Sequence, residues 1–214
     1  MVGIGIGVLA VVALGAWGAL IYNVKTVERP AYATVAEDGD VEIRDYPPLV
    51  VAEVPRRGDR WSAVQRGFGP LARYIFAQSR GGEKIAMTAP VTQSRTDRIA
   101  MTAPVTQSQH EDGAWAVRFI MPSAYTLETL PEPSADVRLE ELPARRVAAI
   151  RFSGYATDAR VAEHEAELRA WMADHALEPG APPTYAYYDD PWMPGPLRRN
   201  EVMIEVAERP SAAR

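Results

Sequence analysis

Two stretches of the sequence decide the predicted fold: VEIRDYPPLVVAEV at residues 41–54 and VRLEELPARRVAAI at residues 137–150. They align without a gap, and Pro47 falls opposite Pro143. Apolar and polar residues alternate around each proline, which is typical of two consecutive β-strands. A segment with apolar residues at helical spacing follows each stretch, so the sequence predicts two related halves.

The same patterns locate the individual elements. We predict strands at residues 33–36, 41–45, 49–54, 137–142 and 147–152, and helices at residues 61–77 and 158–175. We expect the first three strands to form a meander and Asp59 to cap the first helix. Gly67, Gly69 and Pro70 are expected to bend or break that helix.

Continued into the helices, the ungapped alignment sets Ile75 opposite Trp171 and Phe76 opposite Met172. Two such halves predict an α+β fold, in which a pseudo-twofold pair of βαββ units forms a distorted barrel or curved sheet with two helices on it. Ligand sites favour the seams between structural units, so we expect an apolar groove between the halves.

The chain has 214 residues, enough for one domain and an appendage. Residues 2–24 carry no charge, and as a helix they would span about 35 Å, sufficient to cross the hydrocarbon core of a bilayer. We therefore predict a single-pass membrane protein, whose segments are a transmembrane anchor (1–24), a linker (25–31), the folded domain (32–207) and a flexible tail (208–214). A cleaved signal peptide is the alternative, and the side of the membrane that the domain faces stays open.

Composition argues against several functions. The net charge of −5 provides no excess of Lys and Arg to displace counterions from phosphates, so nucleic acid is not an expected partner. The chain has no cysteine, which excludes disulfides, thiolate metal sites and covalent haem attachment. No Ser-His-Asp, HExxH or phosphate-binding motif occurs, so we expect a binding protein rather than an enzyme.

One ten-residue segment, IAMTAPVTQS, occurs twice, at residues 85–94 and 99–108. The two copies can be paired as a β-hairpin in which Met87 extends the wall of the groove. The equally weighted alternative is a surface loop that accommodates a local duplication.

Five motifs follow one another along residues 32–206. They are VEIRDYPPLVVAEV, RYIFAQSRGGEKIAMTAPV, FIMPSAYTLETLPEP, RVAAIRFSG and YDDPWMPGPLRRNEVMIEV. In this order they resemble the SOUL/haem-binding protein family, whose hallmark is similar to KIAMTAPV at residues 84–91. We assign the family's single copy of this element to the first repeat, because it follows SRGGEK directly.

The resemblance implies two βαββ halves, similar to effector-binding domains of the GyrI type, and haem or another tetrapyrrole as a non-covalent ligand. Haem needs an apolar slot for its ring and cations for its propionates. On the first predicted helix, Phe68, Leu71 and Ile75 are candidates to face the ring, and Arg66 and Arg73 are candidates to bind the carboxylates. The alternative is that the apolar residues are core and the arginines form a solvated face.

An axial ligand for haem iron is optional, and no other metal site is predicted. His164 and His175, on the second predicted helix, are candidate weak axial ligands, with a half-buried structural role as the alternative. His110 lies in the polar turn QHEDG and is expected to face solvent. Tyr187 belongs to an aromatic cluster that either lines the mouth of the groove or packs ordinarily.

These expectations describe a protein that carries, buffers or senses haem or a related tetrapyrrole at a membrane. Two alternatives stay open. One is a hydrolase of small hydrophobic molecules, as in some GyrI-like relatives, which needs a buried carboxylate with a raised pKa. The other is a scaffold that binds a lipid or a partner's helix.

Overall fold

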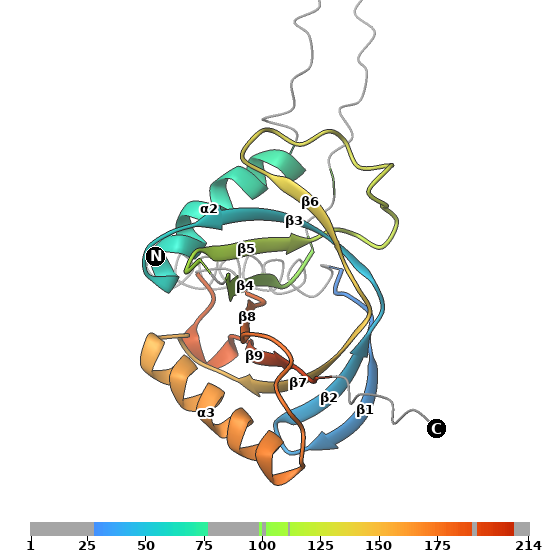
Figure 1. The fold of residues 1–214 in the computed structure, drawn as a ribbon. Helices are drawn as coiled ribbons and strands as arrows, with labels where there is room; N and C mark the ends of the chain where they lie inside the picture. Colours follow the sequence, from blue (N-terminus) through green and yellow to red (C-terminus); the bar gives the residue numbers. More distant parts are fainter. Residues whose placement is uncertain (1–27, 77–98, 100–101, 111, 190–191, 208–214) are drawn as a thin grey trace, which may run out of the picture.

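The computed structural model describes residues 28–76, 99, 102–110, 112–189 and 192–207. Over these residues the protein is α+β, with one nine-stranded antiparallel sheet and two α-helices (Figure 1). The predicted membrane span, Met87 and the first copy of the repeat lie outside the described residues. Within the described part, no helix is long and apolar enough to cross a membrane.

The elements follow the sequence pattern closely. The strands are β1 (Ala33–Asp38), β2 (Val41–Tyr46), β3 (Leu49–Arg56), β4 (Val105–Gln109), β5 (Trp115–Ile120), β6 (Arg138–Leu142), β7 (Arg145–Phe152), β8 (Thr184–Tyr187) and β9 (Asn200–Glu205). The helices are α2 (Arg60–Ile75), α3 (Asp158–Asp174) and the short 3-10 helix η1 (Gly195–Leu197). Every strand and helix that the periodicity predicts is present, with ends that differ by one or two residues.

The strand order is symmetric. The sheet runs β1-β2-β7-β9-β8-β4-β5-β3-β6, and without β1 the order reads as two mirrored sets that meet between β8 and β4. One half is β2-β3-α2-β4-β5, and the other is β6-β7-α3-β8-β9. The predicted pair of related units is therefore confirmed by the topology, and β1 is an addition to the first unit.

The predicted meander of the first three strands is wrong. β1 pairs with β2, but β2 then pairs with β7, and β3 pairs with β5 and β6. Only Pro47 and Pro48 separate β2 from β3, and a two-residue hairpin needs a positive φ that proline cannot adopt. Because β2 pairs with β7 while β3 pairs with β6, the sheet curls and its ends approach each other (Figure 1).

Helix α2 begins as predicted but is not broken. The side chain of Asp59 accepts a hydrogen bond from the backbone N–H of Ser62 at 2.9 Å. Pro70 lies inside the helix, which continues to Ile75. Since Pro70 has no N–H, the carbonyl of Arg66 lacks its helical donor and accepts a long bond of 3.4 Å from Arg56 Nε instead.

The ungapped alignment fails inside the helices. Two residues separate Arg56 from the cap Asp59, whereas four separate Phe152 from the cap Thr157, so the second helix is displaced by two positions. Met172 therefore corresponds to the buried Tyr74 rather than to the exposed Phe76. Here the alternation of the strands was a better guide than the spacing between elements.

The second copy of the repeat, not the first, provides strand β4. It lies between β5 and β8 and pairs with both. The first copy lies outside the described residues, so the choice between a hairpin of the two copies and a surface loop stays a prediction. The strand that the second copy provides, β4, is joined to β5 by a short loop. Gln109 at the end of β4 pairs with Trp115 at the start of β5.

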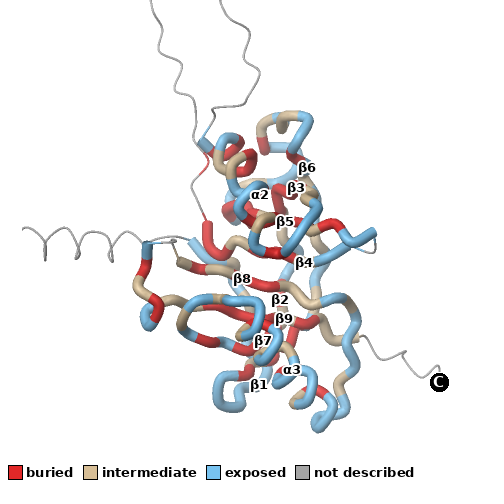
Figure 2. Tube along the Cα trace, turned by 90° about the vertical axis from the view of Figure 1, so that its left-hand side faces the viewer, coloured by how far each residue is buried: buried red, intermediate tan, exposed pale blue. Residues whose placement is uncertain are grey.

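The two helices cover the outer face of the curled sheet. α2 packs on β3 and β5, and α3 packs on β7 and β9 (Figure 1). Beneath each helix lies a separate apolar cluster, one containing Leu71 and Val117 and the other containing Leu168 and Ile204. Buried residues concentrate on the central strands, whereas β1 and many of the loops are exposed (Figure 2).

Candidate functional site

A cavity of about 330 Å³ lies inside the curl of the sheet. Each strand from β2 to β9 contributes at least one side chain to its wall. Because side chains alternate along a strand, Arg118 and Ile120 face the cavity while Val117 and Phe119 face α2. The site is thus the inner face of the same sheet whose outer face holds the helices.

Much of the wall is apolar. Its apolar members are Leu49, Ile120, Leu142, Val147, Ala181 and Met203, with Pro30, Pro104, Pro143 and Pro182. Thr106, Ser108 and Thr184 add hydroxyl groups. The volume is at the lower end of the range of small-molecule pockets, about 300–1,000 Å³, and an apolar wall with a few polar groups is typical of such sites.

Arg145 brings a positive charge into this wall without a direct ion-pair partner, although the carboxylate of Glu205 lines the same cavity. No described Asp or Glu oxygen lies within ion-pair distance of its guanidinium, which sits 5.8 Å from the ring of Tyr46. Burial lowers the pKa of Arg145, and the charge of Arg118 lowers it further, against the opposing influence of Glu205 and Tyr46. The cavity therefore presents a partly desolvated cation that an anionic ligand would stabilise.

Arg118, the second cation of the wall, is compensated. Its Nη2 lies 2.7 Å from Glu53 Oε2, and its Nη1 donates to Ser108 Oγ at 2.7 Å. The Glu53 side chain is only 4% exposed, so this ion pair is shielded from solvent. Of the two arginines, Arg145 is the one available to a ligand.

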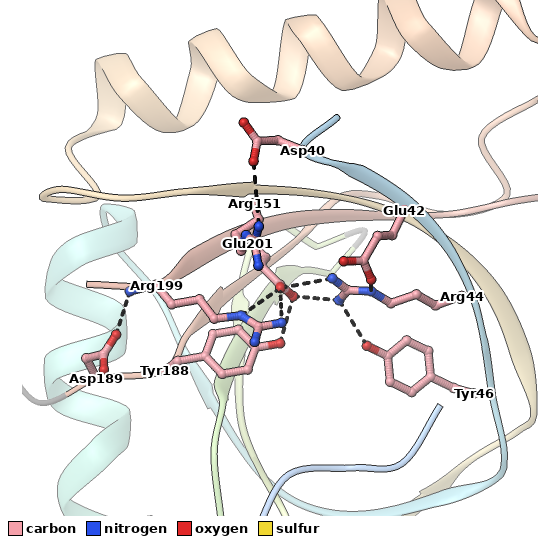
Figure 3. Close-up of polar contacts among 9 residues, drawn as sticks. All are labelled: Asp40, Glu42, Arg44, Tyr46, Arg151, Tyr188, Asp189, Arg199 and Glu201. Atoms are coloured by element: carbon pink, nitrogen blue, oxygen red, sulfur yellow. Dashed lines mark hydrogen bonds and ion pairs between the residues drawn. The ribbon is translucent and has the colours of Figure 1, made fainter. Parts of the chain in front are cut away.

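A buried ionic network supports one side of the cavity (Figure 3). Glu201 accepts hydrogen bonds from Arg44 at 2.7 and 3.0 Å, from Arg199 at 2.6 and 3.0 Å, and from the hydroxyl of Tyr188 at 2.7 Å. Arg44 Nη1 also donates to the hydroxyl of Tyr46 at 3.3 Å. Since Tyr46 and Tyr188 line the cavity, the network fixes the position of two aromatic wall residues.

The network is not suited to proton transfer. Burial by itself raises the pKa of Glu201, but its hydrogen bonds and charge interactions with Arg44 and Arg199 outweigh burial and lower it. Burial raises the pKa of Tyr188 well above its usual value, and Glu201 raises it further. Glu201 therefore stays ionised and Tyr188 stays protonated, which is the behaviour of a structural network.

His110 lies at the edge of the cavity. It lines the cavity and also an outer depression with Arg56, Arg57 and Arg138, so it marks the opening between the two. Its Nε2 is 3.3 Å from Glu53 Oε1, and its side chain is 42% exposed. The expectation of a solvent-facing turn is half right, because the ring is exposed but also forms part of the site.

The chain that follows the predicted anchor also joins the wall. Pro30 lines the cavity, and the guanidinium of Arg29 lies 5.5 Å from the ring of Tyr188. The carbonyl of Glu28 accepts a hydrogen bond from the backbone N–H of Ala103 at 2.9 Å. Residues 28–30, expected to be linker, thus pack against the domain.

The site residues proposed on α2 lie elsewhere. Leu71 and Ile75 are 0% and 1% exposed in the core between α2 and the sheet, so the packing alternative describes them. Phe68 is 41% exposed and packs edge-on against Phe119, with ring centroids 5.2 Å apart. Arg66 donates to the carbonyl of Arg57, and Arg73 is exposed.

The candidates on α3 and β8 are also outside the cavity. His164 stacks on Phe152 at 4.3 Å, and His175 stacks on Trp171 at 3.9 Å. Tyr187 accepts a hydrogen bond from Arg60 and packs against both apolar clusters. The structure therefore does not bring the predicted residues together, and within the described part no three His, Asp or Glu residues are placed to hold a metal ion.

Comparisons with known proteins agree with this architecture. Among solved structures, the EcmrR C-terminal domain is similar, with TM-score 0.57 and 12% identity over 83% of this chain and 99% of that one. A hydrolase from Listeria innocua is similar with TM-score 0.52 and 14% identity, over 81% and 94% of the two chains. At these identities the likeness shows the fold alone.

No curated protein matches the chain. The family model described as SOUL heme-binding protein matches residues 27–205, which includes every strand and helix of the described structure. The chain therefore belongs to the SOUL heme-binding protein family.

Proposed function

We propose that the protein binds haem or a related tetrapyrrole through the cavity of the curled sheet, and that it carries, buffers or senses this ligand at a membrane. The family supports the ligand class. The observation that carries the location is Arg145, a partly desolvated cation of the cavity wall that forms no ion pair with a described carboxylate, although Glu205 lines the same cavity. A propionate would supply the missing anion.

The residues present fit such a ligand. Leu49, Leu142 and Val147 offer the apolar contacts that a macrocycle needs, and Arg145 offers a charge-assisted hydrogen bond to a carboxylate. A cavity of about 330 Å³ is small for a macrocycle, so part of the ring stays at the mouth beside His110. In the outer depression, Arg56 and Arg138 can neutralise a second carboxylate, whereas Arg57 is already paired with Asp112.

The membrane role is part of this proposal. Residues 1–24 would anchor the chain and residues 32–207 would form the binding domain. The contacts of Arg29 and Pro30 with the cavity wall support a short connection between anchor and site. A ligand that partitions into the bilayer would then be taken up close to the membrane surface.

The proposed function is tested by titrating the full-length protein with haemin and following the Soret band. Arg145→Met keeps the length of the side chain and removes its charge, and we expect about tenfold to a hundredfold weaker binding, since a hydrogen bond to a charged group contributes about 1.5–3 kcal/mol. Arg146→Met is the matched control, because Arg146 pairs with Asp45 on the outside. Equal affinity for both variants, or no saturable binding by the wild type, contradicts the proposal.

The hydrolase alternative gains no support from the site. It requires a carboxylate with a raised pKa, whereas the pKa of the buried Glu201 is lowered. Glu53, the other buried carboxylate near the cavity, is paired with Arg118. Tetrapyrrole binding is therefore the function that the geometry favours.

A further inference from the structure

His110 is held at the mouth of the cavity by a tight loop. It follows β4 directly, and its backbone N–H donates to the carbonyl of Ala114 at 2.7 Å. Its own carbonyl accepts a hydrogen bond from Gly113 at 3.0 Å, and Gly113 has the positive φ of 78° that such a turn requires. The imidazole is therefore presented from a short β-hairpin rather than from a long loop.

The orientation of the ring is set by Glu53. One oxygen of Glu53 lies 3.3 Å from His110 Nε2, and the other accepts from Arg118 Nε at 2.8 Å. A carboxylate that holds one imidazole nitrogen leaves the second nitrogen free, and this pairing is the usual support of metal-bound histidines. No described residue forms a hydrogen bond with His110 Nδ1, so Nδ1 is the nitrogen left for a metal ion.

Other potential iron ligands in the wall are less suitable. The hydroxyls of Tyr46 and Tyr188 are engaged by Arg44 and Glu201, and burial raises the pKa of both, which disfavours the phenolate. Met203 offers only a neutral thioether. His110 is the imidazole, among the described residues, that lines the cavity, because the other two histidines lie on α3 or at its end.

We propose that His110 is the axial ligand of haem iron at the mouth of the cavity and that Glu53 is its positioning residue. This inference rests on the proposed function and adds a metal-specific contact to it. Arg145 recognises the carboxylate of any such porphyrin, whereas His110 distinguishes an iron porphyrin from one without metal.

The experiment compares haemin with metal-free protoporphyrin on the full-length protein and on His110→Ala. We expect His110→Ala to shift the Soret band, change the electron paramagnetic resonance signal of the ferric complex and weaken haemin binding by about tenfold or more. Protoporphyrin binding should weaken far less than haemin binding, because the metal-free ring loses only its contact with the imidazole. Added imidazole should restore the wild-type haemin spectrum in the variant.

Glu53→Gln tests the positioning role separately. Resonance Raman spectra of the ferrous complex should still show an iron–histidine stretch, but at a lower frequency, because the imidazole loses its carboxylate partner. A purely structural role for Glu53 would leave this frequency unchanged.

The outcomes separate this inference from the proposed function. If haemin and protoporphyrin both bind and the haemin spectrum of His110→Ala equals that of the wild type, the axial role is overturned while the function stands. The same holds if the spectrum changes in His164→Ala instead. If neither porphyrin binds to the wild type, the proposed function and this inference fail together.

Discussion

We expect Arg145 to destabilise the folded protein in the absence of a ligand. Its guanidinium is partly desolvated, and burial lowers its pKa by more than the charge of Glu205 raises it. We expect Arg145→Met to stabilise the protein by about 1 kcal/mol, which raises the melting temperature by about 2–4 °C for a chain of this size. Arg146→Met, which breaks an exposed pair, should lower stability by less than about 1 kcal/mol. A lower melting temperature for Arg145→Met would mean that Arg145 is structural.

Glu201, unlike Arg145, is expected to stabilise the folded protein. Three partners, Arg44, Arg199 and Tyr188, depend on its carboxylate in the interior (Figure 3). Glu201→Gln leaves Arg199 without a counter-charge and the buried Arg44 with Glu42 as its remaining partner, and we expect a loss of about 3–5 kcal/mol in the free energy of unfolding. Urea denaturation measures the change, with Asp45→Asn as the exposed control. A loss of under about 1 kcal/mol would contradict the network's role.

The same carboxylate predicts a pH dependence. Because the pKa of Glu201 in the folded protein is lowered from 4.5, its contribution is complete above that value and is lost as the pH falls through the folded pKa. The wild type should therefore lose stability between about pH 5 and pH 3, and Glu201→Gln should show a shallower decline. Urea midpoints measured across this pH range for the wild type and Glu201→Gln test the difference. If the stability of both proteins declined equally with falling pH, groups other than Glu201 would cause the acid sensitivity.

The residues of the site were the hardest part to predict from the sequence. The apolar stripe of α2 was recognised, but a stripe does not reveal whether its partner is the sheet or a ligand, and Leu71 and Ile75 proved to be core. Arg145 lies two residues before Val147 on β7, so both side chains point to the same face of the sheet and line the cavity. The sequence does not show that the sheet curls, so it could not show that this face encloses a cavity.

At the scale of elements, the packing of α2 depends on one glycine. A Cβ on Gly67 would lie 2.7 Å from the side chain of Val117 on β5, whereas a Cβ on Gly69 meets nothing closer than 3.6 Å. Alanine favours a helix over glycine by about 1 kcal/mol, so Gly69→Ala should stabilise the protein slightly. Gly67→Ala should destabilise it by about 1–3 kcal/mol through overpacking.

Thermal denaturation of the two variants in parallel tests this contrast. The double variant Gly67→Ala/Val117→Ala should regain part of the loss, since the colliding methyl groups are removed. If Gly67→Ala were as stable as Gly69→Ala, helix and sheet would not be in the contact that the structure shows.

Strands and helices were predictable because they depend on local periodicity. The pairing of the strands was not predictable in this way. We interpreted Pro47 and Pro48 as a turn within a meander, but the strands on either side of them pair with different neighbours, β2 with β7 and β3 with β6. The β7–α3 connection, two residues longer than its counterpart, likewise displaced the helix alignment. Both errors concern connections, where a small change in length alters long-range contacts.

For the whole molecule, internal symmetry was the strongest prediction. The matched stretches implied two halves, and the strand order is symmetric about the β8–β4 pair. What the symmetry did not reveal is the face that binds. We expected an apolar groove between the halves with residues of the first helix facing the ligand, whereas the structure has a cavity on the inner face of the sheet.

The central claim is that a tetrapyrrole occupies this cavity, and a crystal structure of the haemin complex tests it most directly. We predict density for the ring against Leu142 and Val147, with a propionate within hydrogen-bond distance of Arg145. Density on the exposed side of α2, beside Trp61 and Phe68, with the cavity empty, would contradict the account.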